Sequence, residues 1–374
     1  MDFLYVVLPA LIVLAGILVA WLVIRRYRSL RTSAHSTARK TFERLALSSI
    51  AIVALALAAS SAINAILLHH ARAAMPGRLY LVDGHRMRLD CTGQGSPTLV
   101  LDAGLGNDGL VWSGVQPVLA QATRVCSYDR AGMGWSDPVP PPRDADHIAD
   151  QLHSLLAVAG INGPIVLMGH SIAGMYIRAY AARYPAQVAG LIFVDASTPW
   201  QNRDPALQSE MHLSHPPRLR IALVQATLVL GFPRWSGGCS HGPSGLAPAL
   251  SKLSAENRCH LLVLAPVGEM LVFDQSGAET VHTTFGNLPI LVLSSDPART
   301  LADHQPQAMV DAWERMQANL ARLSTRGRRI IAKGSPHYIQ LVRPDLIEKE
   351  VPLFIEQIRG TAPQPSNYGS TTVE

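Results

Sequence analysis

Two long apolar runs dominate the first part of this chain. Residues 3–24 carry no charged side chain, and residues 45–68 form a second uncharged run that is richer in Ala and Ser. A helix needs about 20 apolar residues to cross a bilayer, so each run is long enough to span one. We therefore predict two transmembrane helices within residues 1–74, joined by a loop over residues 25–44.

Each apolar run also has a second interpretation. Residues 3–24 could form a cleaved signal peptide, but Met1-Asp2-Phe3 lacks the positive region with which such peptides begin. The second run could be a buried or interfacial helix, since it contains the polar residues Ser48, Ser49, Ser60, Ser61 and Asn64. Its length favours a span.

After residue 75, short apolar runs alternate with helical patterns such as residues 148–158 and 308–323. Asp83-Gly84, between the first two runs, is a hairpin signal. Continuous apolar strands with crossover helices are typical of a sheet that is buried on both faces. We therefore predict an α/β domain over residues 75–360 with a mostly parallel, eight-stranded sheet. Its strands are expected at residues 79–82, 87–91, 98–101, 124–128, 165–168, 191–194, 290–293 and 329–331.

The spacing of the strands has one anomaly. Residues 198–287 separate the sixth and seventh strands, far more than a crossover requires. We expect this insertion to be a helical lid over a site, with a structural subdomain as the alternative. Its uncharged run, residues 221–233, is too short to span a bilayer and is expected to line a pocket or touch the membrane face. The polar tail, residues 361–374, is expected to be disordered.

The net charge of +5 is concentrated in one segment. Residues 25–44 hold seven basic residues and one acid, Glu43, so the rest of the chain is close to neutral. The excess of basic over acidic residues therefore indicates a membrane-flanking loop and gives no sign of a nucleic-acid surface. By the positive-inside rule this loop is cytoplasmic, which places the domain beyond the second span outside the cytoplasm, in the periplasm or extracellular space. The prediction is a multi-pass membrane protein.

The cysteines agree with that location. All of them follow the second apolar run, at Cys91, Cys126, Cys239 and Cys259. An even number in an oxidising compartment predicts disulfides, with free buried thiols as the alternative. A metal site built from Cys239, Cys259, His241 and His260 would match no zinc-ligand spacing, so no metal is expected.

The candidate nucleophile is Ser171, in the segment Gly169-His170-Ser171-Ile172-Ala173-Gly174. An apolar strand pattern precedes this segment and a helical pattern follows it, which is the setting of a nucleophile elbow. The positions two before and two after the serine must be small, and Gly169 and Ala173 satisfy this. The start of the following helix favours a developing oxyanion. An ordinary turn is the alternative.

A serine nucleophile needs a base, and the base needs an acid to orient it. His337 follows the last predicted strand, where the base is expected. Asp296, after the seventh strand, gives the usual chain order of serine, acid and histidine. Asp195, at the end of the sixth strand, is the alternative acid, and either carboxylate could instead be a structural cap.

The oxyanion hole needs a second backbone donor besides the N–H of Ile172. The segment Asp102-Ala103-Gly104-Leu105-Gly106 follows the third strand, and its glycines allow a close approach of the backbone. We expect the N–H of Leu105 to be that donor, with a plain glycine-rich turn as the alternative. A dinucleotide loop is not indicated, because no G-x-G-x-x-G motif opens a helix here.

Several segments between residues 78 and 360 resemble the α/β-hydrolase fold family. The resemblance is to a bacterial branch of serine hydrolases and esterases. It is carried by Cys91-Thr92-Gly93, Gly95-Ser96-Pro97, Tyr128-Asp129-Arg130-Ala131-Gly132-Met133-Gly134-Trp135-Ser136-Asp137, the elbow segment, and His337 with Pro344.

The resemblance implies that the second strand lies beside the fourth, which would let Cys91 and Cys126 form a bridge. Two departures stand out. Ala103-Gly104 replaces the family's common His-Gly, and the family's acid usually lies further beyond the seventh strand than Asp296 does.

The expected function is that of a membrane-anchored serine hydrolase, which cleaves a carboxylic ester through an acyl-enzyme on Ser171 without a metal or organic cofactor. The apolar lid and the nearby bilayer favour a small-molecule or lipid-like acyl substrate, while peptides and lactones stay open. A serine at the elbow argues against a dehalogenase or an epoxide hydrolase, where the family places an aspartate. The alternative is a non-catalytic, membrane-tethered binding module with the same fold.

Overall fold

The computed structural model describes the chain except residues 1–6, 209–217, 240–241, 243–244, 259–263, 282 and 366–367. The chain divides into two compact units. The first comprises the described parts of residues 1–74, 217–241 and 255–261, and the second comprises those of residues 75–216, 242–254 and 262–374. The insertion predicted at residues 198–287 is therefore shared between both units.

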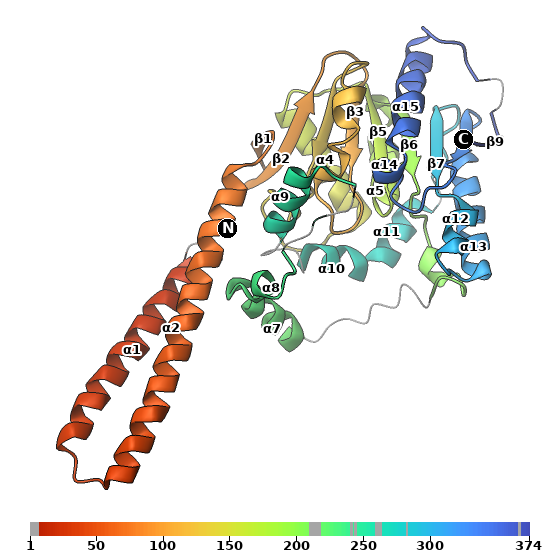
Figure 1. The fold of residues 1–374 in the computed structure, drawn as a ribbon. Coiled ribbons are helices and arrows are strands. Elements are labelled where there is room, and N and C mark those ends of the chain that lie inside the picture. Colours follow the sequence, from red (N-terminus) through yellow and green to blue (C-terminus); the bar gives the residue numbers. More distant parts are fainter. Residues whose placement is uncertain are drawn as a thin grey trace. The chain divides into compact units, whose positions relative to one another are not determined.

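The first unit contains two long helices, α1 (Leu8–Thr32) and α2 (Thr37–Ala73), which pack along each other (Figure 1). Both are long and apolar enough to cross a membrane. A Cβ atom on Gly16 would lie 2.8 Å from the Cβ of Ala58, so a small residue permits this close packing. The same unit includes α7 (Arg218–Val229) and α8 (Phe232–Trp235) from the insertion.

The loop predicted at residues 25–44 is mostly helical, which corrects the sequence-based boundaries. Only residues 33–36 between α1 and α2 are not helical. The Arg and Lys residues of this segment are good helix formers. Arg26 of α1 and Arg39 of α2 both pair with Glu43, which links the ends of the two helices.

The second unit is built on one nine-stranded sheet in the order β1-β2-β4-β3-β5-β6-β7-β8-β9 (Figure 1). Strand β2 runs antiparallel to β1 and β4, and the pairs from β4 through β9 are parallel. The eight strands predicted from the sequence are confirmed. Their bounds are β1 Arg78–Val82, β2 His85–Thr92, β3 Thr98–Asp102, β4 Val125–Tyr128, β5 Ile165–His170, β6 Val188–Val194, β7 Ile290–Ser294 and β8 Gly327–Ile331.

A ninth strand, β9 (Thr371–Val373), corrects the prediction of a disordered tail. It pairs with β8 in parallel, with Arg329 opposite Thr371 and Ile331 opposite Val373. The open edge of β8 offers unpaired backbone groups, and a Thr-Thr-Val segment has the residue types that favour a strand.

Helices cover both faces of the sheet. Along β3, Val100 packs toward α4 and α5, whereas Leu99 and Leu101 pack toward η2, α3 and α15. The hairpin predicted at Asp83-Gly84 is confirmed, with both residues at positive φ. The remaining helices of this unit and of the insertion are η2 Gly109–Trp112, α3 Gln116–Leu119, α4 Ala145–Val158, α5 Ala173–Arg183, η3 Pro185–Gln187, η4 Gln201–Arg203, α9 Pro248–Arg258, α10 Leu264–Leu271, α11 Phe273–Thr280, α12 Pro297–Ala302, α13 Gln307–Ala321, α14 Ile339–Val342 and α15 Pro344–Arg359.

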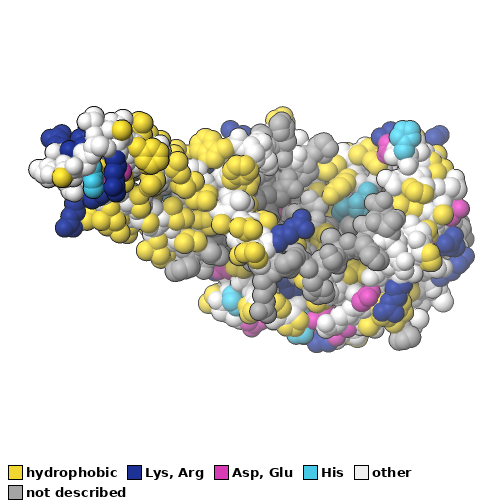
Figure 2. All heavy atoms as spheres, turned by 90° about the horizontal axis from the view of Figure 1, so that it is seen from below, with side chains coloured by type: hydrophobic (Ala, Val, Ile, Leu, Met, Phe, Trp, Pro, Cys, Tyr) yellow, Lys and Arg dark blue, Asp and Glu magenta, His cyan; other side chains and the backbone are white. Residues whose placement is uncertain are grey.

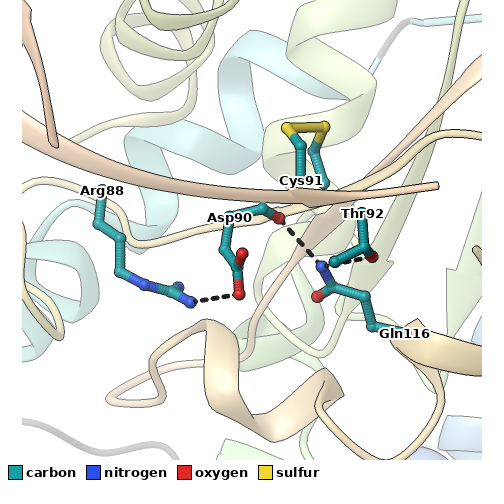
Figure 3. The surroundings of a disulfide bond; sticks show 6 residues. Arg88, Asp90, Cys91, Thr92 and Gln116 are labelled. Carbon is teal, nitrogen blue, oxygen red and sulfur yellow. Dashed lines mark hydrogen bonds and ion pairs between the residues drawn. A yellow bond between two sulfur atoms is a disulfide. The ribbon is translucent and has the colours of Figure 1, made fainter. Parts of the chain in front are cut away.

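A disulfide joins Cys91 to Cys126, as the family resemblance implied (Figure 3). The two residues face each other in the register of β2 and β4, with Cα atoms 4.0 Å apart. The Gln116 amide beside the bridge donates to the carbonyl of Asp90. Cys239 is also disulfide-bonded. Cys259, His241 and His260, which the metal-site alternative used, lie outside the described residues.

Candidate active site

Ser171 lies at a sharp turn between β5 and α5, as the elbow pattern predicts. Its φ of 57° is in the left-handed region, which is strained for a residue with a side chain. The turn is fixed from both sides: the Ser171 N–H donates to Val194 O at 3.2 Å, and the Ser197 N–H donates to Ser171 O at 2.7 Å. The end of β6 therefore holds the serine at the carboxyl end of the parallel strands.

Two glycines allow the elbow to pack this closely. A Cβ atom on Gly169 would lie 2.9 Å from the carbonyl oxygen of Ala173, and one on Gly174 would lie 2.5 Å from the Cβ of Ala196. Both distances are too short for real atoms. The requirement for a small residue two positions before Ser171, inferred from the sequence, thus has a direct steric cause at Gly169.

The glycine-rich segment after β3 lies against the elbow. A Cβ atom on Gly104 would lie 3.2 Å from the Cβ of Ser171 and 2.7 Å from Nδ1 of His170. The Arg130 guanidinium donates to the carbonyl oxygens of Ala103 and of Gly104, the latter at 3.1 Å. Because a trans peptide points its C=O and N–H in opposite directions, the N–H of Leu105 is directed away from Arg130.

Arg130 is the centre of a buried cluster of charges. Its guanidinium donates to Asp102 at 2.6 Å and to both carboxylate oxygens of Glu269 at 3.0 Å. Arg143 and the hydroxyl of Tyr176 bind the same Glu269 carboxylate. Glu269 lies on α10, so this cluster connects the insertion to the segment beside Ser171.

Burial shifts the ionisation of this cluster. It raises the pKa of Asp102 to about 6, against the lowering effect of the Arg130 charge. The cluster could not be predicted from the sequence, because nothing in the chain pattern pairs Arg130 with a residue 139 positions away.

His337 is oriented by Asp195. The distance from His337 Nδ1 to Asp195 Oδ2 is 2.7 Å. The other carboxylate oxygen of Asp195 accepts from the N–H and hydroxyl of Ser295 and from Nε1 of Trp313, all within 2.9 Å. Burial opposes ionisation of Asp195, but the hydrogen bonds from His337, Ser295 and Trp313 outweigh it and hold its pKa below the usual value.

Asp296, the acid preferred from the sequence, has a different place in the structure. Its Oδ1 accepts from the N–H of Ala298 at 2.9 Å and so caps α12, while its Oδ2 accepts from the N–H of Gly334 at 2.7 Å. The expected contact with His337 is made by Asp195 instead. Asp296 therefore has the alternative role expected for it, that of a structural cap, and it also holds the loop that leads to His337.

His170, next to Ser171, supports the same loop. Its buried ring lies 4.6 Å from that of His337, and its Nε2 is 3.1 Å from the carbonyl oxygen of His337. Burial, with the neighbouring His337, lowers the pKa of His170 to about 3, so the ring is neutral and Nε2 can donate to that carbonyl. On the other side of Ser171, Ile172 is the N-cap of α5, where backbone N–H groups lack intrahelical partners.

A cavity of about 330 Å³ opens beside the His337–Asp195 pair. Its lining is mainly apolar, with Leu207, Met309, Val310 and Trp313 among its residues. This volume is at the lower end of the range for small-molecule sites.

Comparisons with known proteins agree with the fold. Residues 97–262 match the family model described as alpha/beta hydrolase fold. An uncharacterized protein of Schizosaccharomyces pombe, C23C11.06c, is 45% identical over 84 residues, which are 22% of this chain and 16% of that protein. The chain spans about a sixth of the length of the first curated relatives that it matches.

Two solved structures illustrate the range of similar proteins. A thermophilic esterase from Thermogutta terrifontis is 21% identical, with a TM-score of 0.51 over 76% of this chain and 99% of the esterase. A bacterial membrane phospholipase A is 20% identical, with a TM-score of 0.55 over 85% of this chain and 99% of the phospholipase. With the sheet order, the elbow and the family match, these similarities identify the chain as a protein of the α/β-hydrolase fold.

Proposed function

We propose that this protein is a membrane-anchored serine hydrolase that cleaves a carboxylic ester through an acyl-enzyme on Ser171. The observation that carries the proposal is the 2.7 Å contact between His337 Nδ1 and Asp195, together with the left-handed elbow at Ser171, whose neighbour His170 contacts the carbonyl of His337. A buried carboxylate on Nδ1 fixes the tautomer that leaves Nε2 free to accept a proton.

In the proposed reaction, Ser171 Oγ attacks the ester carbonyl carbon while His337 takes the hydroxyl proton. The C–O bond to the alcohol then breaks, and His337 returns the proton to the leaving oxygen. Water repeats the sequence on the acyl-enzyme, releasing the carboxylic acid and free Ser171. The proposal requires no metal or organic cofactor.

The proposed oxyanion donors are the N–H groups of Leu105 and Ile172. Arg130 supports this assignment, because it holds the Gly104 carbonyl and so directs the Leu105 N–H away from itself. Ile172 precedes the first turn of α5, where the helix dipole favours negative charge.

A lipid-like ester is the favoured substrate class. The two candidate spans α1 and α2 support it. The likeness to a membrane phospholipase A agrees with it. The unusual spacing of Asp296 beyond the seventh strand is the feature that favours the non-catalytic alternative, and it carries no weight when Asp195 is the acid.

A fluorophosphonate probe tests the nucleophile in the purified full-length protein. We expect labelling of the wild type and of Ser113→Ala, a serine outside the site, and none of Ser171→Ala. Equal labelling of wild type and Ser171→Ala would refute the proposal. A series of esters with increasing acyl length then tests the substrate class, and a preference for acetyl over long chains would exclude a lipid-like substrate.

We also propose that the hydrolase unit lies outside the cytoplasm, based on the basic residues between the spans. A reporter that is active only in an extracytoplasmic compartment, fused after Glu374 so that β9 stays intact, is expected to be active. Activity of a cytoplasmic reporter at the same position would reverse this orientation.

A further inference from the structure

Polar side chains of α2 cap the end of a helix from the insertion. The last carbonyls of α7 have no partners within the helix. Asn64 Nδ2 donates to Leu228 O at 3.0 Å, Ser61 Oγ donates to Val229 O at 3.2 Å, and Ser60 Oγ donates to Leu230 O. These serines and the asparagine are among the polar residues that made the second apolar run ambiguous in the sequence.

The short helix α8 completes the contact. Trp235 Nε1 donates to Ser60 Oγ at 2.6 Å, and Arg234 Nε donates to Asn64 Oδ1 at 3.1 Å. Ser61 is 0% exposed and Asn64 is 4% exposed. Polar groups within a hydrocarbon layer must find protein partners. The insertion supplies them at this point of α2.

The segment also exposes several large apolar side chains in the described part of the chain. Leu219, Leu223, Phe232 and Trp235 are each at least 58% exposed. The only charged residues of α7 are Arg218 and Arg220, in its first turn. An apolar surface of this kind marks a contact with a protein partner or a membrane.

Its continuity with α2 favours the membrane. Ile63, Ile66 and Leu67, next to the capping residues on α2, are also exposed. Figure 2 shows the hydrophobic side chains over the helix pair, with Lys and Arg gathered at one end. The lipid that would surround α2 would therefore also meet this segment.

The depth of the contact agrees with an interfacial position. The apolar run of α2 ends at Leu68, and the cap spans Ser60 to Asn64. At 1.5 Å per residue, the cap lies about 6–12 Å inside that end of the span. Interfacial helices bury their apolar face to a similar depth, and Trp is enriched at this level.

We propose that residues 218–235 form a third membrane element, which lies in the leaflet opposite the basic segment and presents Leu219, Leu223, Phe232 and Trp235 to lipid acyl chains. The inference depends on the proposed membrane anchoring by α1 and α2. Through this element, the insertion would contact the bilayer directly, and the bilayer is where a lipid-like substrate would be found.

Depth-dependent fluorescence quenching tests this. The full-length protein, with a bimane label at Leu223→Cys or Phe232→Cys, is placed in vesicles of phosphatidylcholine and phosphatidylglycerol, with and without brominated phosphatidylcholine. Ile52→Cys, exposed on α2, is the control within the span, and Val158→Cys, exposed on the hydrolase unit, is the control outside it. We expect loss of emission at Leu223, Phe232 and Ile52, and none at Val158.

The outcomes separate this inference from the proposed function. Quenching at Ile52 without quenching at Leu223 and Phe232 would overturn the third membrane element and leave the anchoring in place. Unchanged emission at all labelled positions would overturn both.

Discussion

Replacing each candidate acid by asparagine gives a matched pair of variants. Asp195→Asn keeps one oxygen that can accept from Ser295 and Trp313, which hold the carboxylate at 2.8–2.9 Å. The amide nitrogen is then directed at His337 Nδ1. Nδ1 must become an acceptor, so the proton moves to Nε2 and the ring can no longer take the proton of Ser171.

The expected cost follows from this change of tautomer. The corresponding replacement in a serine protease lowers kcat by about 10⁴, which is about 5.5 kcal/mol of barrier. Asp296→Asn keeps an oxygen for the N–H of Ala298, so the cap of α12 is retained, and it loses the acceptor for the N–H of Gly334, a hydrogen bond worth about 1 kcal/mol of stability. We expect its kcat to change by less than about tenfold, since 1.4 kcal/mol corresponds to a factor of ten.

The assay is the hydrolysis of a p-nitrophenyl ester by both purified full-length variants, with thermal unfolding measured alongside. A larger loss of kcat in Asp296→Asn than in Asp195→Asn would refute the assignment of the acid. Full activity of Asp195→Asn would refute the reaction scheme itself.

Two further predictions follow from buried groups of the site. Arg130→Lys is expected to lower kcat by about 10²-fold with little change in KM. The three donors of one ammonium cannot replace the bonds of the guanidinium to Asp102, Glu269 and both loop carbonyls, so the Leu105 N–H loses its orientation. Arg143→Lys is the control, because Arg143 also binds Glu269, and it should reduce only thermal stability. Equal kcat in both variants would contradict the role of Arg130. His170→Gln is expected to make unfolding less sensitive to acid. The folded-state pKa of about 3 lies below the ordinary 6.5, so the unfolded state binds the extra proton and wild-type stability falls between pH 6.5 and 3. Chemical denaturation across this range should show that the free energy of unfolding falls by about 1.4 kcal/mol more per pH unit in the wild type than in the variant. Equal pH dependence of the free energy of unfolding in both proteins would refute the neutral buried ring.

The parts of the site that the sequence predicted are those set by local pattern. Ser171 needs only a strand, small neighbours and a helix start, and all of these lie within a few residues of it. The cluster around Arg130 depends on Glu269, which reaches it from the insertion, and no periodicity of the chain indicates such a contact. The strand at Thr371–Val373 could not be predicted for a related reason, because three residues with strand-forming side chains need the edge of β8 to pair with.

Chain order alone cannot decide whether Asp195 or Asp296 is the acid that orients His337. Asp195 and Asp296 follow neighbouring strands, since Val194 of β6 pairs with Leu293 of β7, so both carboxylates reach the same edge of the sheet. Their local conformations separate them: Asp195 has a φ of 41°, in the left-handed region, whereas Asp296 has an extended backbone and precedes Pro297 at the start of α12. An aspartate directly before a proline is a typical helix start, with the carboxylate as N-cap. That signal was present in the sequence and favours a capping role for Asp296, which leaves Asp195 as the carboxylate available to the imidazole.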